Sequence, residues 1–244
     1  MSEVRNPEKR TLIREMLISL SLSVQEEQID QLLRYYEMLI DRNRVMNLTA
    51  ITTFDDVVEK HFADSLLITK VLDLNSVSSV IDVGSGAGFP GMVMKILFPH
   101  LRMTMLDSLQ KRVAFLNEVT ENLGLDEVSS VHGRAEDYGR DEAFREQYDL
   151  CVSRAVADLS VLSELCIPFV KQSGMFISYK SAQAVEEVNR AGHAIELLGG
   201  SVCGMHRACL PFSGQERLFV CIEKKEPTPL KYPRRAGMPS KKPL

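Results

Sequence analysis

Three glycines at alternating positions, Gly84, Gly86 and Gly88, directly follow a predicted strand over residues 80–83. Glycine lets the backbone adopt a positive φ and lacks the Cβ that would hold a ligand away, and the helix after such a loop offers unpaired N–H groups. The pattern is typical of a ligand-binding loop, although turns of this kind also occur without a ligand. Phe89 stands where a dinucleotide-binding loop has its last glycine, and no Gly-Lys-Ser/Thr of a P-loop follows.

Polar residues also follow the later predicted strands, and ligands of open α/β sheets bind beyond these strand ends. Asp107 ends the second strand, where its carboxylate can accept hydrogen bonds from two ribose hydroxyls or cap a helix that starts at Ser108. Glu136 follows the third strand and can meet an adenine amino group. The other candidates at strand ends are Arg134, Ala135, Arg154 within Ser153-Arg154-Ala155, and Lys180. A ribose, an adenine and a group without phosphate near the glycines fit S-adenosylmethionine better than NAD.

Short apolar runs alternate with helical patterns between residues 76 and 225, which predicts a mostly parallel sheet with right-handed crossovers. The predicted strands cover residues 80–83, 103–106, 129–131, 150–152 and 175–178. The helical patterns between them cover residues 91–98, 111–123, 159–170 and 182–198. Two further strands, 201–206 and 217–223, have no helix between them, so we expect an antiparallel pair that closes one edge of the sheet.

The first 75 residues are predicted to form a helical segment. Ser23 and Glu26 fit a capping box before apolar residues at helical spacing, and Thr53 is placed to cap a second helix. His61 lies on the apolar face of that second helix. We expect it to pack there with a hydrogen bond to Asp64 or to the nearby backbone, without a catalytic role.

The composition is that of a globular protein with one principal core, since 45% of the 244 residues are hydrophobic and 25% are charged. Residues 1–10 are charged and lack an apolar segment, so we expect no signal peptide. The apolar run 91–98 is too short to span a bilayer. Five cysteines without a C-x-x-C motif favour reduced thiols and a cytoplasmic location. Cys203, His206 and Cys209 would alternate across a strand and lack a fourth ligand, so no metal site is expected.

The charge is unevenly distributed along the chain. Residues 223–244 contain seven lysines and arginines and two glutamates, a net charge of +5, which leaves −9 for the rest of a chain with a net charge of −4. Such a basic, proline-rich tail is either an arm for a polyanion or a solubilising disordered segment. If it is an RNA-binding arm, truncation before Lys231 weakens RNA binding more than cofactor binding.

Taken in order, these motifs closely resemble those of the RsmG (GidB) family of bacterial 16S rRNA guanine-N7 methyltransferases. The resemblance covers nearly the whole chain and includes Asn47-Leu48-Thr49, His61 with Asp64-Ser65, the run from Asp82 to Gly91, Leu106-Asp107-Ser108, Lys111-Arg112, Phe115-Leu116, Ser153-Arg154-Ala155, Glu216-Arg217 and the segment from Lys231 to Gly237. It implies a Rossmann-like S-adenosylmethionine-dependent methyltransferase core over residues 76–225, between the N-terminal helical segment 1–75 and the basic tail 226–244.

The same resemblance implies that S-adenosylmethionine is contacted by Gly84, Phe89, Ala135, Glu136 and Arg154, in addition to Gly86 and Gly88 of the loop. Asp107 as the ribose acceptor follows the more general methyltransferase pattern. The expected partner is 16S rRNA or the small-subunit ribonucleoprotein, with no membrane or DNA involved, and the expected state is a monomer.

Guanine N7 carries an in-plane lone pair and no proton, so its methylation needs no general base. Catalysis then depends on aligning the guanine with the methyl donor. The candidates for holding RNA phosphates or the guanine are Arg134, Arg154 and Lys180. The Asn/Asp-Pro-Pro-aromatic motif of exocyclic-amine methylases is absent, and no cysteine has proline as its immediate neighbour, as a cytosine-C5 methylase would usually have. Two alternatives remain: a methyltransferase of another RNA or of a small molecule, or a non-catalytic adenosine-ligand-binding module in ribosome maturation.

Overall fold

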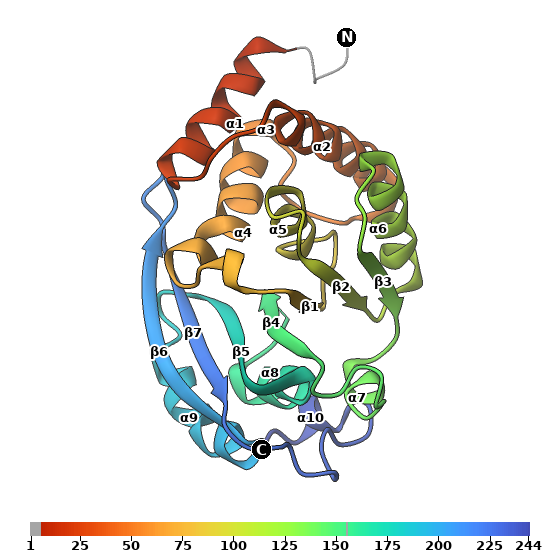
Figure 1. Ribbon diagram of the computed structural model, residues 1–244, viewed down its shortest axis with the longest axis vertical. Helices are drawn as coiled ribbons and strands as arrows, with labels where there is room; N and C mark the ends of the chain where they lie inside the picture. Colours follow the sequence, from red (N-terminus) through yellow and green to blue (C-terminus); the bar gives the residue numbers. More distant parts are fainter. Residues whose placement is uncertain (1–5, 155) are drawn as a thin grey trace.

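A computed structural model describes residues 6–154 and 156–244, so Ala155 and the first five residues lie outside the described part of the chain. Its centre is a seven-stranded sheet in the order β3-β2-β1-β4-β5-β7-β6 (Figure 1). The strands are β1 (Ser79–Val83), β2 (Arg102–Asp107), β3 (Val128–His132), β4 (Tyr148–Arg154), β5 (Val170–Ser181), β6 (Gly200–Cys209) and β7 (Glu216–Lys224). Strands β1 to β5 pair in parallel, and β7 is antiparallel to both β5 and β6. The predicted α/β class, the mostly parallel sheet and the antiparallel pair at its edge are confirmed.

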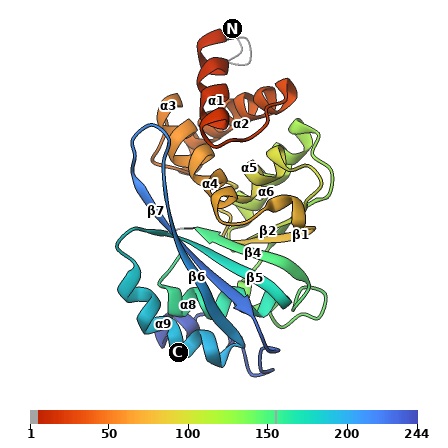
Figure 2. The same cartoon turned by 60° about the vertical axis from the view of Figure 1, so that its left-hand side comes forward.

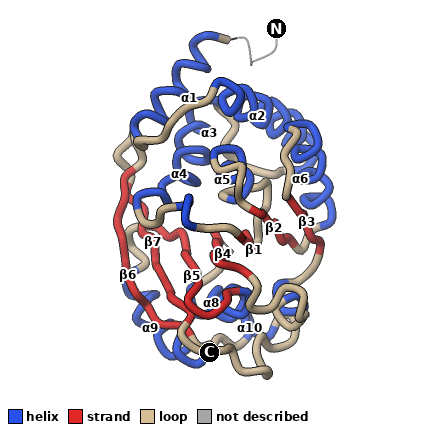
Figure 3. Tube along the Cα trace, viewed as in Figure 1, coloured by secondary structure: helices blue, strands red, loops and turns tan. Residues whose placement is uncertain are grey.

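Helices cover both faces of the sheet (Figures 2 and 3). One face carries α1 (Pro7–Ser19), α2 (Glu26–Met46), α3 (Phe54–Val57), α4 (Asp64–Leu66), α5 (Gly91–Leu97) and α6 (Gln110–Leu123), and the other carries α7 (Ala135–Tyr138), α8 (Leu159–Cys166), α9 (Val185–Leu197) and α10 (Met238–Lys241). Successive strand residues therefore enter different cores: Val80 packs with the first group of helices and Ile81 with the second. Because both faces are covered, β1 is buried at every position, which explains its nearly continuous apolar sequence.

The helix predicted over residues 159–170 is too long. α8 ends at Cys166, a 3₁₀ turn covers Ile167–Phe169, and β5 already begins at Val170. Pro168 has no N–H to continue the α-helical hydrogen bonds, so apolar periodicity alone overestimated this helix.

The N-terminal helical segment is joined to the core by polar contacts as well as apolar packing. In α2, Gln28 donates hydrogen bonds to the carbonyls of Ile96 and Leu97 at 3.0 and 3.2 Å, and Gln31 donates to that of Leu123 at 2.9 Å. These bonds satisfy carbonyls at the C-termini of α5 and α6 that have no partner within their own helices. The segment thus fixes the ends of the two helices that flank the glycine loop.

The two predicted helix starts in this segment differ from the structure in detail. α2 begins at Glu26 rather than after Ser23, and the Gln25 N–H donates to Gln28 Oε1 at 3.3 Å. Thr53 does precede α3, but its hydroxyl donates to Asp56 Oδ2 at 2.8 Å and caps no backbone N–H. The second helix is also irregular, with a π-helical turn over Val58–Ala63 between α3 and α4.

The C-terminal tail is folded against the core. Arg145 donates to the carbonyls of Thr228 and Tyr232 at 2.5 and 2.8 Å, and Arg234 forms an ion pair of 2.6 Å with Glu164 of α8. The segment then ends in α10, which contacts α8. A disordered tail, one of the two alternatives that the composition left open, is therefore wrong. Across the described ranges, no helix combines the length and the apolar composition that crossing a membrane requires.

Candidate cofactor and acceptor sites

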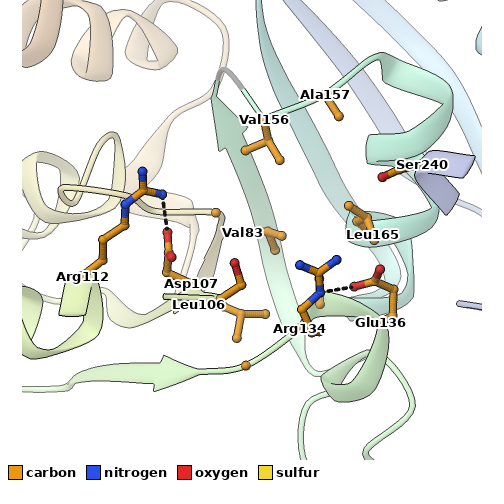
Figure 4. Close-up of a pocket in the computed structure, with 14 residues that line it drawn as sticks. Val83, Leu106, Asp107, Arg112, Arg134, Glu136, Val156, Ala157, Leu165 and Ser240 are labelled. Atoms are coloured by element: carbon orange, nitrogen blue, oxygen red, sulfur yellow. Dashed lines mark hydrogen bonds and ion pairs between the residues drawn. The ribbon is translucent and has the colours of Figure 1, made fainter. Parts of the chain in front are cut away.

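A cavity of about 360 Å³ opens beyond the carboxyl ends of β1 to β4 (Figure 4). Five of the residues predicted from the sequence line it: Gly84, Asp107, Arg134, Ala135 and Glu136. Gly86, Gly88, Phe89, Arg154 and Lys180, which the sequence also predicts as site residues, do not line this cavity. We call it the cofactor cavity because its residues are those expected around an adenosine.

Asp107 is both a structural anchor and a lining residue. Its side chain is 3% exposed; Oδ2 accepts from the Gly86 N–H at 2.9 Å, and Oδ1 accepts from the Leu109 N–H at 2.9 Å. Arg112 approaches Oδ2 at 3.4 Å (Figure 4). A carboxylate has about four acceptor positions. Asp107 can therefore hold the loop in place and still accept a hydrogen bond from a ligand in the cavity.

Glu136 lies in the first turn of α7 and is 4% exposed. Its Oε1 accepts from the Gly237 N–H at 2.8 Å, and its Oε2 lies 3.6 Å from Arg134 Nε. Figure 4 shows this pair together with Ser240, which comes from α10 and also lines the cavity. The C-terminal tail thus contributes directly to the wall, and no signal in the sequence had indicated Ser240.

The glycine loop is shaped by contacts on two sides. Gly84 has φ +78°, and a Cβ there would come within 2.6 Å of Val156 Cγ2, another residue of the cofactor cavity. Gly88 has φ +103°, and a Cβ there would come within 2.7 Å of Tyr35 Oη, which donates to the Ala87 carbonyl at 2.5 Å. Gly84 therefore permits close approach on the cavity side, whereas Gly88 permits packing against α2.

Asp82, within the apolar run of β1, is a buried carboxylate beside the glycine loop, and the sequence prediction gave it no separate role. It is fully buried, and its Oδ2 accepts from the Gly91 N–H at 2.9 Å, while its Oδ1 has no hydrogen-bond partner among the described residues. Burial raises the pKa of Asp82 to about 7. Asp82 lines neither the cofactor cavity nor the cavity described next, so its bond to Gly91 fixes the first residue of α5 behind the glycine loop. An acidic residue inside an apolar strand was the signal that could have indicated it.

A second cavity, of about 470 Å³, contains Arg154 and Lys180, two of the predicted positioning residues, and for that reason we call it the acceptor cavity. Asp64 also lines it and is 4% exposed. Oδ2 of Asp64 accepts from Arg154 Nη1 at 2.6 Å, and Oδ1 accepts from Arg217 Nε at 2.6 Å. Arg217 comes from β7, far from Asp64 in the chain. The sequence prediction gave it no role, although Glu216-Arg217 is one of the motifs that carry the family resemblance.

His61 is held in its neutral form beside these arginines. Its Nε2 lies 2.8 Å from Thr49 Oγ1, its Nδ1 lies 3.3 Å from Arg154 Nη2, and its ring stacks on Phe89 with centroids 4.3 Å apart. Burial first, and then the charge of Arg154, lower the pKa of His61 to about 3. The expected packing role is correct, and so is a hydrogen bond to the nearby backbone, at Lys60. Side-chain contacts go to Thr49 and Arg154, whereas Asp64 binds the two arginines.

Both cavities are lined by residues at or just after the end of β4. Arg154 lines the acceptor cavity, whereas Val156 and Ala157 line the cofactor cavity. Lys180 of the acceptor cavity donates to the Ala157 carbonyl at 2.7 Å and pairs with Glu187 at 2.5 Å. Residues from the end of β4 and from just after it therefore line both cavities, Arg154 the one and Val156 and Ala157 the other.

Comparisons with known proteins support the same interpretation. Residues 28–212 match the sequence model of the GidB family, which is described as rRNA small subunit methyltransferase G. Proteins named Ribosomal RNA small subunit methyltransferase G include one from Alkaliphilus metalliredigens, 48% identical over 97% of this chain and 99% of that protein, and one from Bacillus cereus (strain B4264), 47% identical over 94% and 96%.

The fold is also shared with solved structures. An O-methyltransferase from Bacillus cereus in complex with SAH superposes with a TM-score of 0.55 at 14% identity, covering 78% of this chain and 91% of that one. A putative O-methyltransferase from Klebsiella pneumoniae gives 0.53 at 13% identity, covering 79% and 90%. At these identities the likeness concerns the fold, and the Rossmann-like methyltransferase architecture predicted from the sequence is confirmed.

Proposed function

The chain belongs to the GidB family, rRNA small subunit methyltransferase G, and on that premise we propose that it transfers a methyl group from S-adenosylmethionine to N7 of a guanine in 16S ribosomal RNA. The observation that carries this proposal is the pair of cavities lined by residues at or just after the end of β4. One is lined by residues suited to an adenosine, and the other holds two arginines around a buried carboxylate.

The cofactor cavity offers acceptors for the ribose and the adenine of S-adenosylmethionine, whose sulfonium supplies the methyl group. Asp107 is the acceptor for ribose hydroxyls, and Glu136 and the Ala135 backbone lie where the adenine would bind. Asp82 is fully buried and lines neither cavity, so its part is to hold the start of α5 behind the glycine loop through the Gly91 N–H. Gly84 keeps the loop free of a side chain where the cofactor would approach. Gly86 contributes indirectly, because its N–H donates a hydrogen bond to Asp107 and helps to hold that carboxylate in place.

The acceptor cavity fits a base that must be oriented but not deprotonated. Guanine presents O6 and N7 as acceptors on one edge, and arginine guanidinium groups are suited donors to O6. Asp64 holds Arg154 and Arg217 in place, and the neutral His61 adds no charge beside the attacking nitrogen. N7 already carries its lone pair, so the contribution of the chain is to align the base and to exclude water. Lys180 forms an ion pair with Glu187 and donates a hydrogen bond to the Ala157 carbonyl, so it holds Ala157 in position.

Arg134 is the candidate for a phosphate contact, since its side chain is 51% exposed at the mouth of the cofactor cavity. We further propose that the substrate is 16S rRNA, either free or in the small-subunit ribonucleoprotein, and that the enzyme acts as a monomer in the cytoplasm.

A methyl-transfer assay with matched arginine variants tests whether Arg217 serves the methyl acceptor and not the cofactor. Arg217→Ala is expected to lower methyl transfer from labelled S-adenosylmethionine to rRNA or small subunits at least about tenfold, with the affinity for S-adenosylhomocysteine unchanged, since a lost charged hydrogen bond costs about 1.5–3 kcal/mol. Arg207→Ala is the control, because Arg207 forms an exposed pair with Glu216 on the same hairpin. Transfer to a protein or a small molecule but not to rRNA would overturn the proposal, as would equal activity of the two variants.

A further inference from the structure

The tail from Arg234 to Ser240 reaches the cofactor cavity and contributes Ser240 to its lining. We call residues 234–240 the C-terminal wall. The basic composition of the whole tail predicted an arm for RNA or a disordered segment, but residues 234–240 contact the core of the protein. Two carboxylates on different helices hold it, and both are almost completely buried: Glu164 of α8 is 0% exposed and Glu136 of α7 is 4% exposed.

The first anchor is Arg234. Its Nε lies 2.9 and 3.1 Å from the two carboxylate oxygens of Glu164, its Nη2 lies 2.6 Å from Oε2, and its backbone N–H donates to Oε1 at 2.7 Å. A guanidinium that engages both oxygens of a carboxylate fixes direction as well as distance. Arg234 therefore fixes the tail against α8 at the point from which it continues to the cavity.

The second anchor is the Gly237 N–H, which donates to Glu136 Oε1 at 2.8 Å. Gly237 has φ +81° and directly precedes α10, whose Pro239 is buried. Because Glu136 itself lines the cofactor cavity, one carboxylate joins the wall to the cavity. Ser240 follows Gly237 by less than one helical turn and faces the same space (Figure 4).

We propose that the C-terminal wall completes the adenosine end of the cofactor site and that Ser240 is a cofactor-contacting residue. This inference rests on the proposed function, because it takes the cavity to bind S-adenosylmethionine. It assigns a cofactor-binding role to a segment about a hundred residues beyond Glu136 in the chain. It also revises the expectation from composition: truncation before Lys231 removes both anchors and Ser240, and therefore weakens cofactor binding.

The test measures S-adenosylhomocysteine binding to the full chain by calorimetry. Arg234→Ala is expected to raise the Kd at least about tenfold, since Glu164 loses its partner and the wall detaches. Arg235→Ala is the matched control: it removes the neighbouring charge at an exposed position and is expected to bind like wild type. Thermal unfolding of each variant shows whether the core remains folded.

A second pair of variants keeps both anchors intact. Ser240→Trp fills the cavity from the wall and is expected to lower the affinity at least about tenfold, whereas Lys242→Trp, at an exposed position two residues further, is not. If wild type binds S-adenosylhomocysteine and Ser240→Trp binds equally well, the wall is no part of the site and the inference is wrong. If wild type itself does not bind, the proposed function fails instead.

Discussion

Replacing Asp64 by asparagine is expected to destabilise the protein and to inactivate the acceptor cavity together. Asp64 is 4% exposed and accepts from Arg154 and Arg217 at 2.6 Å each, while these side chains are only 13% and 18% exposed. An asparagine in the same place keeps one carbonyl acceptor but turns its NH₂ group toward the other arginine. Two guanidinium groups then remain next to each other without the negative charge between them.

The magnitude follows from the burial of this cluster. Removing one partner of a buried ion pair costs about 3–5 kcal/mol, and we take the lower value because one acceptor remains. For a chain of this size, about 3 kcal/mol corresponds to a decrease in Tm of about 6–12 °C. The affinity for S-adenosylhomocysteine is expected to stay close to that of wild type, since Asp64 does not line the cofactor cavity.

Calorimetric unfolding, ligand titration and methyl transfer measured on the same preparation check these expectations. Asp56→Asn is the matched control, because Asp56 pairs with Lys60 on the same helical segment but is 44% exposed. Its Tm and its activity are expected to stay close to wild type. If Asp64→Asn unfolds at the temperature of Asp56→Asn and keeps its rate of methyl transfer, the carboxylate does not organise the two arginines.

The remaining predictions concern pH and the cofactor cavity. Between about pH 4 and 6.5, His61 takes up a proton mainly on unfolding and Asp82 mainly on folding, since their pKa values in the fold are about 3 and about 7. Their effects on the free energy of unfolding, about 1.4 kcal/mol per pH unit each, are of opposite sign and compensate. As the pH rises through this window, the free energy of unfolding of His61→Gln is expected to fall relative to wild type, and that of Asp82→Asn is expected to rise. Urea titrations in which both variants follow the pH profile of wild type would contradict this. Asp107→Ala removes the acceptor of the Gly86 and Leu109 N–H groups and is expected to raise the Kd for S-adenosylhomocysteine at least about tenfold, whereas Asp73→Ala, which removes an exposed cap at Asn75, leaves it unchanged. Equal affinities of these two variants in calorimetry would refute the anchoring role of Asp107.

Sequence patterns predicted the sheet well because a parallel sheet covered on both faces needs apolar residues at successive positions, as in β1. They also located Gly84, Asp107 and Glu136 at the cavity, since ligands of such sheets bind beyond the carboxyl ends of the strands. Both successes depend on local sequence and on a general rule of topology.

Pairings between distant segments could not be predicted in the same way. Arg217 reaches Asp64 only because β7 inserts between β5 and β6, and Arg234 reaches Glu164 across 70 residues of chain. The composition of the tail describes its charge but not the carboxylates it meets. His61 was placed correctly in the core, but its partners depend on how Thr49 and Arg154 approach from other elements.

The identity of the methylated atom shows whether the enzyme acts on guanine N7. The protein, S-adenosylmethionine and 16S rRNA or small subunits would be incubated, the RNA digested to nucleosides, and the methylated product compared with authentic standards by mass spectrometry and chromatography. We expect 7-methylguanosine at one position of the small-subunit rRNA, and its loss with Arg217→Ala. A methyl group on an exocyclic amine, on a pyrimidine carbon or on a ribose hydroxyl would contradict it, because each of these acceptors must lose a proton that the acceptor cavity, with its neutral and hydrogen-bonded His61, is not arranged to remove.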